Sequence, residues 1–215
     1  MVTDRFRRVR TRLAAAISIT AMLAIAAGAE TLPDQVVVVE KLHAALLGMM
    51  KNAEELGYEG RFEKVSGVLP DTFDLEFMAS KVVGRRWKKL DEAQQKRWVD
   101  TFGRLTAANY AGRFNQYSDE SFETLGKEAA AHDTVLVLTK IHIPDREDVQ
   151  LNYRLLETPK GWRIIDIYLN GTVSEVAMRR SDYGSVLKND GFEKLCSVVD
   201  ERIAKLEAGE VSGSN

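Results

Sequence analysis

The segment "GWRIIDIYLNG", residues 161–171, decides how the middle of this chain folds. Its β-branched and aromatic residues are typical of a strand, and the Asn-Gly pair at its end favours a tight turn. Strict alternation divides the side chains of the strand between two faces. One face then carries Trp162, Ile164, Asp166 and Tyr168, and the other carries Arg163, Ile165, Ile167 and Leu169. Both faces are then mostly apolar. We therefore predict that the strand is covered on both sides, by helices or by a bound molecule.

The segments before this strand repeat the same period of two. Residues 121–130, 133–143 and 149–157 are β-branched or alternating runs. Short turns at 144–148 and 158–161 separate the later runs. Sequential strands joined by short turns pair antiparallel, because a parallel crossover needs a dozen or more residues. The sequence therefore predicts an antiparallel meander over about 121–169.

Apolar residues recur every three or four positions on both sides of the predicted strands. Predicted helices cover 35–56, about 60–69, about 74–84 and 91–117 before the strands, and roughly 173–188 and 191–207 after them. Gly57 is the predicted stop of the first helix, and Pro70 that of the second. This order indicates an α+β fold, with a curved antiparallel sheet wrapped by helices and a helical subdomain.

The first 29 residues have the composition of a secretory signal peptide. A basic segment, "RFRRVRTR" at 5–12, precedes an apolar run at 13–27, and small residues lead to a predicted cleavage site after Ala29. The apolar run is shorter than the roughly 20 residues of a spanning helix, which favours a cleaved signal peptide over the alternative, an uncleaved membrane anchor. We expect an exported chain with one domain at 30–207 and a disordered tail at 208–215.

Removal of residues 1–29 makes the chain more acidic. That segment carries five arginines and one aspartate, so the rest of the chain has 25 basic and 31 acidic residues, a net charge of −6. Binding to nucleic acid or to a bare anionic membrane is favoured by an excess of positive charge. We therefore expect no nucleic-acid partner.

Short motifs of catalysis and cofactor binding are missing or incomplete. The sequence has neither a P-loop nor a Gly-x-Gly-x-x-Gly turn after a strand, so we expect no nucleotide cofactor. His43, His132 and His142 lie far apart, without the spacing of a zinc site, so we expect no metal. Ser185 and Lys188 match the S-x-x-K pattern, but the K-T-G and S-D-N companions are absent. The sequence therefore predicts a protein that is not an enzyme.

A longer resemblance covers residues 35–206. The order "VLPDTFDLEFMASKVVGRRWKKLDEAQQKRWVDTFGRLTAANYAGRFNQY" followed by "GWRIIDIYLNGTVSEVAMRRSDYGSVLKNDGFEKL" resembles the exported toluene-tolerance family of lipid-binding proteins, the MlaC family. Within it, "RRSDYGSVLKNDGFEKL" at 179–195 is more similar to the branch associated with hopanoids than to the phospholipid branch. The matching features are the helix led by Asp74, the Gly84–Trp87 stretch, the Phe102–Tyr110 helix face and the Trp162, Asp166, Gly171 pattern.

The family resemblance implies a fold and a function. The implied fold is a nuclear transport factor-like cone of helices on a curved sheet, in which helices cover one face of the sheet and lipid covers the other. The implied function is a periplasmic carrier that takes a phospholipid or a hopanoid between the inner and outer membranes. The implied partners are an ATP-driven inner-membrane complex and an outer-membrane donor or acceptor, since the chain itself has no nucleotide site.

Large apolar side chains on the predicted helices and strands are candidates for a cavity lining. From helix face and strand alternation we predict that the ligand is bound by Phe73, Phe77, Met78, Phe102, Tyr110, Phe114, Ile165, Ile167 and Leu169. An ordinary packed core is the other interpretation of these residues. Two other functions stay open. One is a non-catalytic envelope adaptor, and the other is a cavity enzyme of isomerase or dehydratase type that uses His142 and Asp166.

Overall fold

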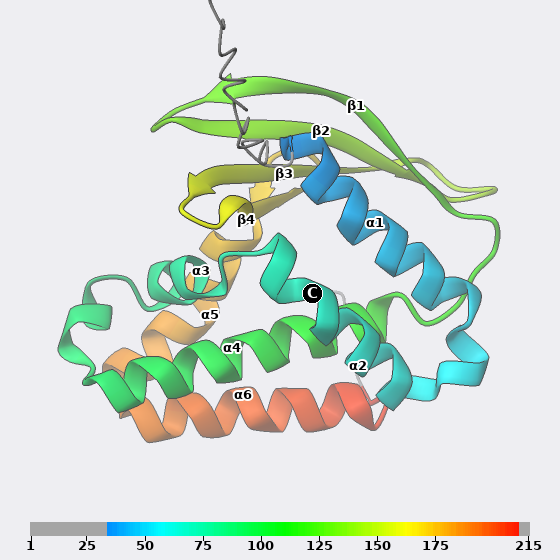
Figure 1. Ribbon diagram of the computed structural model, residues 1–215. Helices are drawn as coiled ribbons and strands as arrows, with labels where there is room; N and C mark the ends of the chain where they lie inside the picture. The colour runs from blue at the N-terminus through cyan, green and yellow to red at the C-terminus, as the bar shows by residue number, and fades with distance from the viewer. Residues whose placement is uncertain (1–33, 211–215) are drawn as a thin grey trace, which may run out of the picture. The chain divides into compact units, whose positions relative to one another are not determined.

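The computed structural model describes residues 34–210, which form one compact unit. The predicted signal peptide and the last five residues of the predicted tail lie outside the described residues. Figure 1 shows a layer of helices on one face of a single sheet, and this confirms the α+β class. Within the described residues, no helix combines the length and the apolar character needed to cross a membrane.

The sheet is an antiparallel meander in the order β1-β2-β3-β4-β5, as predicted for its first four strands. The short β5 was missed, because two residues are too few to show an alternating pattern. The strands are β1 (Ser121–Ala130), β2 (Thr134–His142), β3 (Val149–Thr158), β4 (Gly161–Leu169) and β5 (Val173–Ser174).

Strand β4 does not alternate strictly, because it contains a β-bulge at Ile165. Arg154 of β3 pairs with Asp166, whereas Leu155, the next residue of β3, pairs with Ile164. Ile165 is the extra residue between these two pairs, and it reverses the alternation beyond it. The prediction of two apolar faces was therefore wrong. One face of β4 carries Trp162, Ile164, Ile167 and Leu169, and the other carries Arg163, Asp166 and Tyr168.

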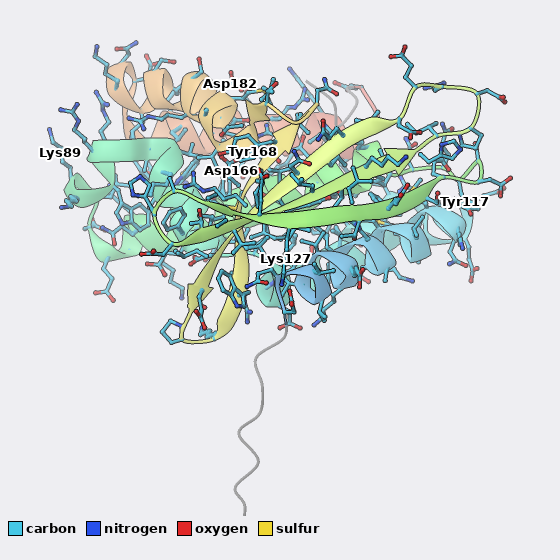
Figure 2. The ribbon with its side chains drawn as sticks, turned by 90° about the horizontal axis from the view of Figure 1, so that it is seen from above. Lys89, Tyr117, Lys127, Asp166, Tyr168 and Asp182 are labelled. Atoms are coloured by element: carbon cyan, nitrogen blue, oxygen red, sulfur yellow. The ribbon has the colours of Figure 1, made fainter. Side chains whose placement is uncertain are left out.

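The two faces of the sheet have different surroundings. The inner face, defined by Tyr153, Leu155, Ile164 and Ile167, is the one covered by the helices, and these four side chains are buried. The outer face carries Asp166 and Tyr168, which Figure 2 labels in a view from that side. On β4 this face carries the half-buried polar side chains Arg163, Asp166 and Tyr168. No lipid is needed to cover this second face, contrary to the expectation from strict alternation.

Strand β1 forms one edge of the sheet and has a bulge of its own. The register with β2 shifts between Thr124 and Gly126, so Leu125 is the extra residue. Most of β1 is exposed, and Leu125 retains 50% of its accessible surface. Charged side chains at Glu123, Lys127 and Glu128 surround this bulge in the sequence.

Helices α3 (Leu75–Val83) and α4 (Glu92–Arg113) begin at side-chain caps, Asp74 and Asp91, where the sequence predicts helix starts. The Asp74 carboxylate accepts a hydrogen bond from the backbone N–H of Phe77 (2.9 Å), and Asp91 forms a capping box with Gln94. The helices are α1 (Gln35–Lys51), α2 (Ala53–Thr72), α3 (Leu75–Val83), the 3₁₀ helix η1 (Gly84–Lys89), α4 (Glu92–Arg113), α5 (Glu175–Asn189) and α6 (Gly191–Glu207).

Helices α1 and α2 differ from the predicted boundaries. Helix α1 ends at Lys51 rather than near Leu56, because Asn52 leaves the helical conformation. Gly57 interrupts α2 with a positive φ of 58°, a conformation that glycine adopts without steric cost. Pro70 lies in the last turn of α2 and not beyond it, since a missing N–H near a helix end removes only one hydrogen bond.

Helix α4 ends four residues earlier than predicted, and this end matters for the site described below. The predicted helix continues to Tyr117, whereas α4 ends at Arg113. Phe114 adopts a non-helical conformation (φ −97°, ψ 63°). The chain therefore turns away at Phe114 and passes into the loop before β1.

The core lies between the helical layer and the inner face of the sheet. Trp98 of α4 is fully buried, and its indole N–H donates to the carbonyl of Ala79 on α3 (2.9 Å). Helix α6 packs along α4 and buries Cys196, the single cysteine of the chain. These contacts join the N-terminal and C-terminal helices into one layer, which is the helical part predicted beside the sheet.

His43 of α1 is buried beneath the sheet in its neutral form. Its Nε2 lies 3.0 Å from the hydroxyl oxygen of Tyr153, and its ring stacks on Phe122. Burial lowers the pKa of His43 from 6.5 to about 4. The unfolded chain therefore takes up a proton before the folded chain does as the pH falls.

The buried His43 predicts a loss of stability in mild acid. Its contribution to the free energy of unfolding is complete above pH 6.5 and decreases as the pH falls to about 4. At 1.36 kcal/mol per unit of pKa shift, the loss is roughly 3 kcal/mol. Urea unfolding at pH 7 and pH 4 should show this loss in the wild type, and a smaller loss in His43→Gln. An equal loss in both proteins would contradict the assignment.

Candidate functional site

A cavity of 580 Å³ lies between the end of α4, the β2–β3 loop and the inner face of the sheet. Its inner wall is apolar and includes Phe114, Ile141, Leu151 and Leu169. Its volume falls in the range of roughly 300–1,000 Å³ that small-molecule sites occupy. The site is therefore large enough for part of a lipid.

The cavity continues into a narrow crevice between α4, α5 and the sheet. Four residues line both spaces, namely Arg113, Phe114, Leu151 and Leu169. The crevice has a free volume of only 30 Å³. A bulky ligand group can enter it only if the lining side chains move apart.

Four of the nine predicted lining residues meet at this site. Tyr110 and Ile167 line the crevice, and Phe114 and Leu169 line the crevice and the cavity. The rings of Tyr110 and Phe114 are stacked, with centroids 5.8 Å apart. The end of α4 and the end of β4 therefore contribute to one surface.

The structure places the other five predicted residues elsewhere. Phe73, Met78 and Phe102 are packed in the core and do not line the cavity. Phe77 is half-buried on α3, with the ammonium group of Lys81 over its ring at 4.6 Å. Ile165 is the bulge residue of β4 and lines neither space. Helix and strand periodicity therefore selects buried positions without separating core from cavity.

A comparison with models of protein families confirms the family resemblance seen in the sequence. The model of the family described as "MlaC protein" matches residues 40–201. The chain belongs to the MlaC family. A solved structure of the phospholipid-binding protein from Ralstonia solanacearum, in complex with a phospholipid, superposes on this MlaC-family chain with a TM-score of 0.71. That likeness covers 81% of this chain and 99% of the other at 24% identity, and it shows a shared fold. The comparison with curated proteins gives no match.

Helix face and strand alternation did not predict several residues that line this MlaC-family site. Leu151 and Tyr153 alternate on β3, so the register of the sheet would have identified them. Asn109 and Arg113 lie on α4, and Arg179 lies on α5. No local sequence pattern marks these polar residues, because their place in the crevice depends on how α4, α5 and the sheet come together.

The crevice holds polar groups in a largely apolar setting. Arg179 is buried, and its Nη2 lies 3.4 Å from the Glu175 carboxylate, one helical turn away. Burial raises the pKa of Tyr110 well above its usual value, and it also raises that of Tyr153. Both hydroxyl groups are therefore neutral and can donate or accept a hydrogen bond.

The rim of the cavity carries both signs of charge. Arg113 and Arg146 lie there with Glu120 and Asp145. The buried Glu120 carboxylate accepts a hydrogen bond from the backbone N–H of Ser118 (2.5 Å). The rim thus offers partners for a group that contains both an anion and a cation.

A second hollow, of 570 Å³, lies between η1 and α5. Figure 2 labels Lys89 of η1 at one end of the described unit and Tyr117, near the end of α4, at the other. Basic side chains line this hollow, including Arg85, Arg180 and Lys188. Its charge makes it a poor site for an apolar ligand.

A cavity enzyme would use His142 and Asp166, but the structure does not bring these two residues together at the site. His142 is exposed, and its Nδ1 lies 2.7 Å from the Asp148 carboxylate. The Asp166 carboxylate accepts hydrogen bonds from the Ser174 hydroxyl and from the backbone N–H of Val176. Neither His142 nor Asp166 lines the cavity or the crevice. The part of the chain that the structure describes also holds no group of three or more metal-ligating side chains.

Proposed function

We propose that this MlaC-family protein is a periplasmic lipid carrier that moves a lipid between the inner and outer membranes. The observation that carries the proposal is the cavity of 580 Å³, with its apolar wall and charged rim. The phospholipid in the complex of the Ralstonia solanacearum protein supports this choice of ligand. The predicted signal peptide supports the compartment.

The carrier would keep the acyl chains of the lipid out of water. Each methylene group exposed to water costs roughly 0.8 kcal/mol, so two chains of about 15 carbons cost on the order of 20 kcal/mol. An apolar cavity removes this cost for the part of the chains that it encloses while the lipid is in the periplasm. The membranes shelter the chains equally well, so the net preference for carrier or membrane is small and exchange is reversible.

The mixed rim favours a phospholipid with a zwitterionic headgroup. Arg113 and Arg146 suit its phosphate, and Glu120 and Asp145 suit its amine. A hopanoid is the second candidate ligand. It is favoured by the resemblance at 179–195, a segment that begins with the crevice residue Arg179.

Direction of transport would come from partners of the carrier. The sequence has no nucleotide-binding motif, so the carrier would exchange lipid with an ATP-driven inner-membrane complex and an outer-membrane donor or acceptor. The acidic surface expected after signal cleavage would disfavour binding to bare anionic membranes. Docking would then depend on specific protein contacts.

Mass spectrometry of organic extracts tests the function directly. The protein is purified from a periplasmic extract without detergent, beside an exported control protein of similar size that lacks a cavity. We expect a stoichiometric phospholipid and an N-terminus at Glu30. A stoichiometric hopanoid would select the second ligand. A folded protein with no lipid would refute the carrier proposal and favour the envelope adaptor.

A further inference from the structure

Asn109 places an unsatisfied hydrogen-bond acceptor in the wall of the crevice. The residue lies on α4 and is 7% exposed. Its Nδ2 donates to the backbone carbonyl of Leu105 (2.7 Å), and its Oδ1 is buried with no hydrogen-bond partner. Among the described residues, the hydroxyl of Tyr58 is also buried and unsatisfied, but Tyr58 lines neither the cavity nor the crevice.

This arrangement is costly for the fold. A buried acceptor without a donor destabilises a protein, because it loses its hydrogen bonds to water and gains none in return. Asparagine is also a poorer helix former than leucine, a side chain of similar length. Position 109 therefore contributes less stability than an apolar residue would contribute there, and the packing of the core does not explain the amide.

The surroundings of Asn109 define which group would satisfy it. The free volume of the crevice is 30 Å³, about the share of one water molecule in the liquid. The Glu175 carboxylate is a further acceptor in the same crevice, while Ile167 and Leu151 keep the rest of the wall apolar. A hydroxyl group is small and supplies a donor, and it can reach the buried Oδ1 once the lining side chains move apart. The methyl end of an acyl chain supplies no donor.

We propose that the crevice binds a hydroxyl group on the apolar body of the lipid, through a hydrogen bond to Oδ1 of Asn109. The ligand class is a lipid with a hydroxyl remote from its headgroup, such as a hydroxylated acyl chain. This inference rests on the proposed function, because it needs a lipid in the neighbouring cavity. It adds a preference among lipids that an apolar cavity alone does not have.

A competition between fatty acids tests this inference. The purified protein is incubated with an equimolar mixture of octadecanoate, a mid-chain hydroxyoctadecanoate and the ω-hydroxy acid, and native mass spectrometry counts the bound species. The wild type should retain one of the hydroxy acids about tenfold over octadecanoate, which corresponds to one satisfied hydrogen bond. Asn109→Leu should bind octadecanoate at least as well as the wild type and should lose the preference. Asn189→Leu, on the exposed end of α5, is the control and should keep it.

The outcomes separate this inference from the proposed function. Equal retention of all three acids by the wild type would refute the hydroxyl site and leave the carrier intact. Retention of none would refute the hydroxyl site, and it would refute the carrier itself only if the protein also carries no lipid from the periplasmic extract. A preference that persists in Asn109→Leu would place the hydroxyl elsewhere. Asn109→Leu should also melt at or above the wild-type temperature, and Asn109→Ala gives a second test of the preference if the leucine does not fold.

Discussion

Replacing Leu169 by aspartate should abolish lipid binding and leave the protein folded. Leu169 lies at the junction of the cavity and the crevice and is half-buried. Its cross-strand neighbours are Leu151 and Val173. A carboxylate pressed against a lipid chain loses its hydration, at a cost of several kcal/mol. Without lipid the same carboxylate can reach water, so the fold loses little stability.

The measurement is the ratio of lipid to protein after purification without detergent. We expect at least about a tenfold decrease for Leu169→Asp, together with a circular dichroism spectrum like that of the wild type. Leu125→Asp is the matched control, because Leu125 is exposed on β1 and lines neither space. A folded Leu169→Asp with undiminished lipid would show that this cavity is not the ligand site.

Replacing Phe102 by alanine should have the opposite effect, a large loss of stability with lipid binding retained. Phe102 is 3% exposed, packs against Trp98 and does not line the cavity. Truncation of a buried phenylalanine costs about 3–5 kcal/mol, because it leaves a hole that the surroundings fill only in part. The folded fraction keeps an intact cavity.

Urea unfolding checks the stability, and the lipid ratio of the folded fraction checks the binding. Phe77→Ala is the control, since Phe77 is half-buried on α3, and it should cost about 1 kcal/mol or less. A stable Phe102→Ala that lacks lipid would mean that Phe102 lines the site after all. The two substitutions together distinguish the core from the cavity.

Phe102 and Tyr110 show how far the sequence predicts this site. They lie eight residues apart on α4, on the same predicted face, and the sequence marks both as apolar and buried. Yet Phe102 contacts Trp98, and Tyr110 lines the crevice. Periodicity reports which side of a helix avoids water. Whether that side meets another side chain or a void depends on elements far away in the chain.

The bulge in β4 shows a second limit. Alternation, turn residues and strand lengths predicted the meander almost to its boundaries, because each is a local property of the sequence. Nothing local in β4 marks Ile165 as an extra residue, since an isoleucine fits a regular strand equally well. The bulge is defined by the partner strand, and only the register of β3 against β4 reveals it. Because of this one extra residue, Asp166 lies on the face predicted for Ile167, and Ile167 lies on the face predicted for Asp166.

The bulge at the sheet edge has a consequence for the behaviour of the protein in solution. An edge strand with free backbone N–H and C=O groups is a template on which strands of other molecules can add. In β1 the extra residue at Leu125 breaks the regular spacing of these groups. An incoming strand would also meet the charges of Glu123 and Glu128. The bulge and these charges therefore disfavour the addition of strands from other molecules, and with it aggregation through this edge.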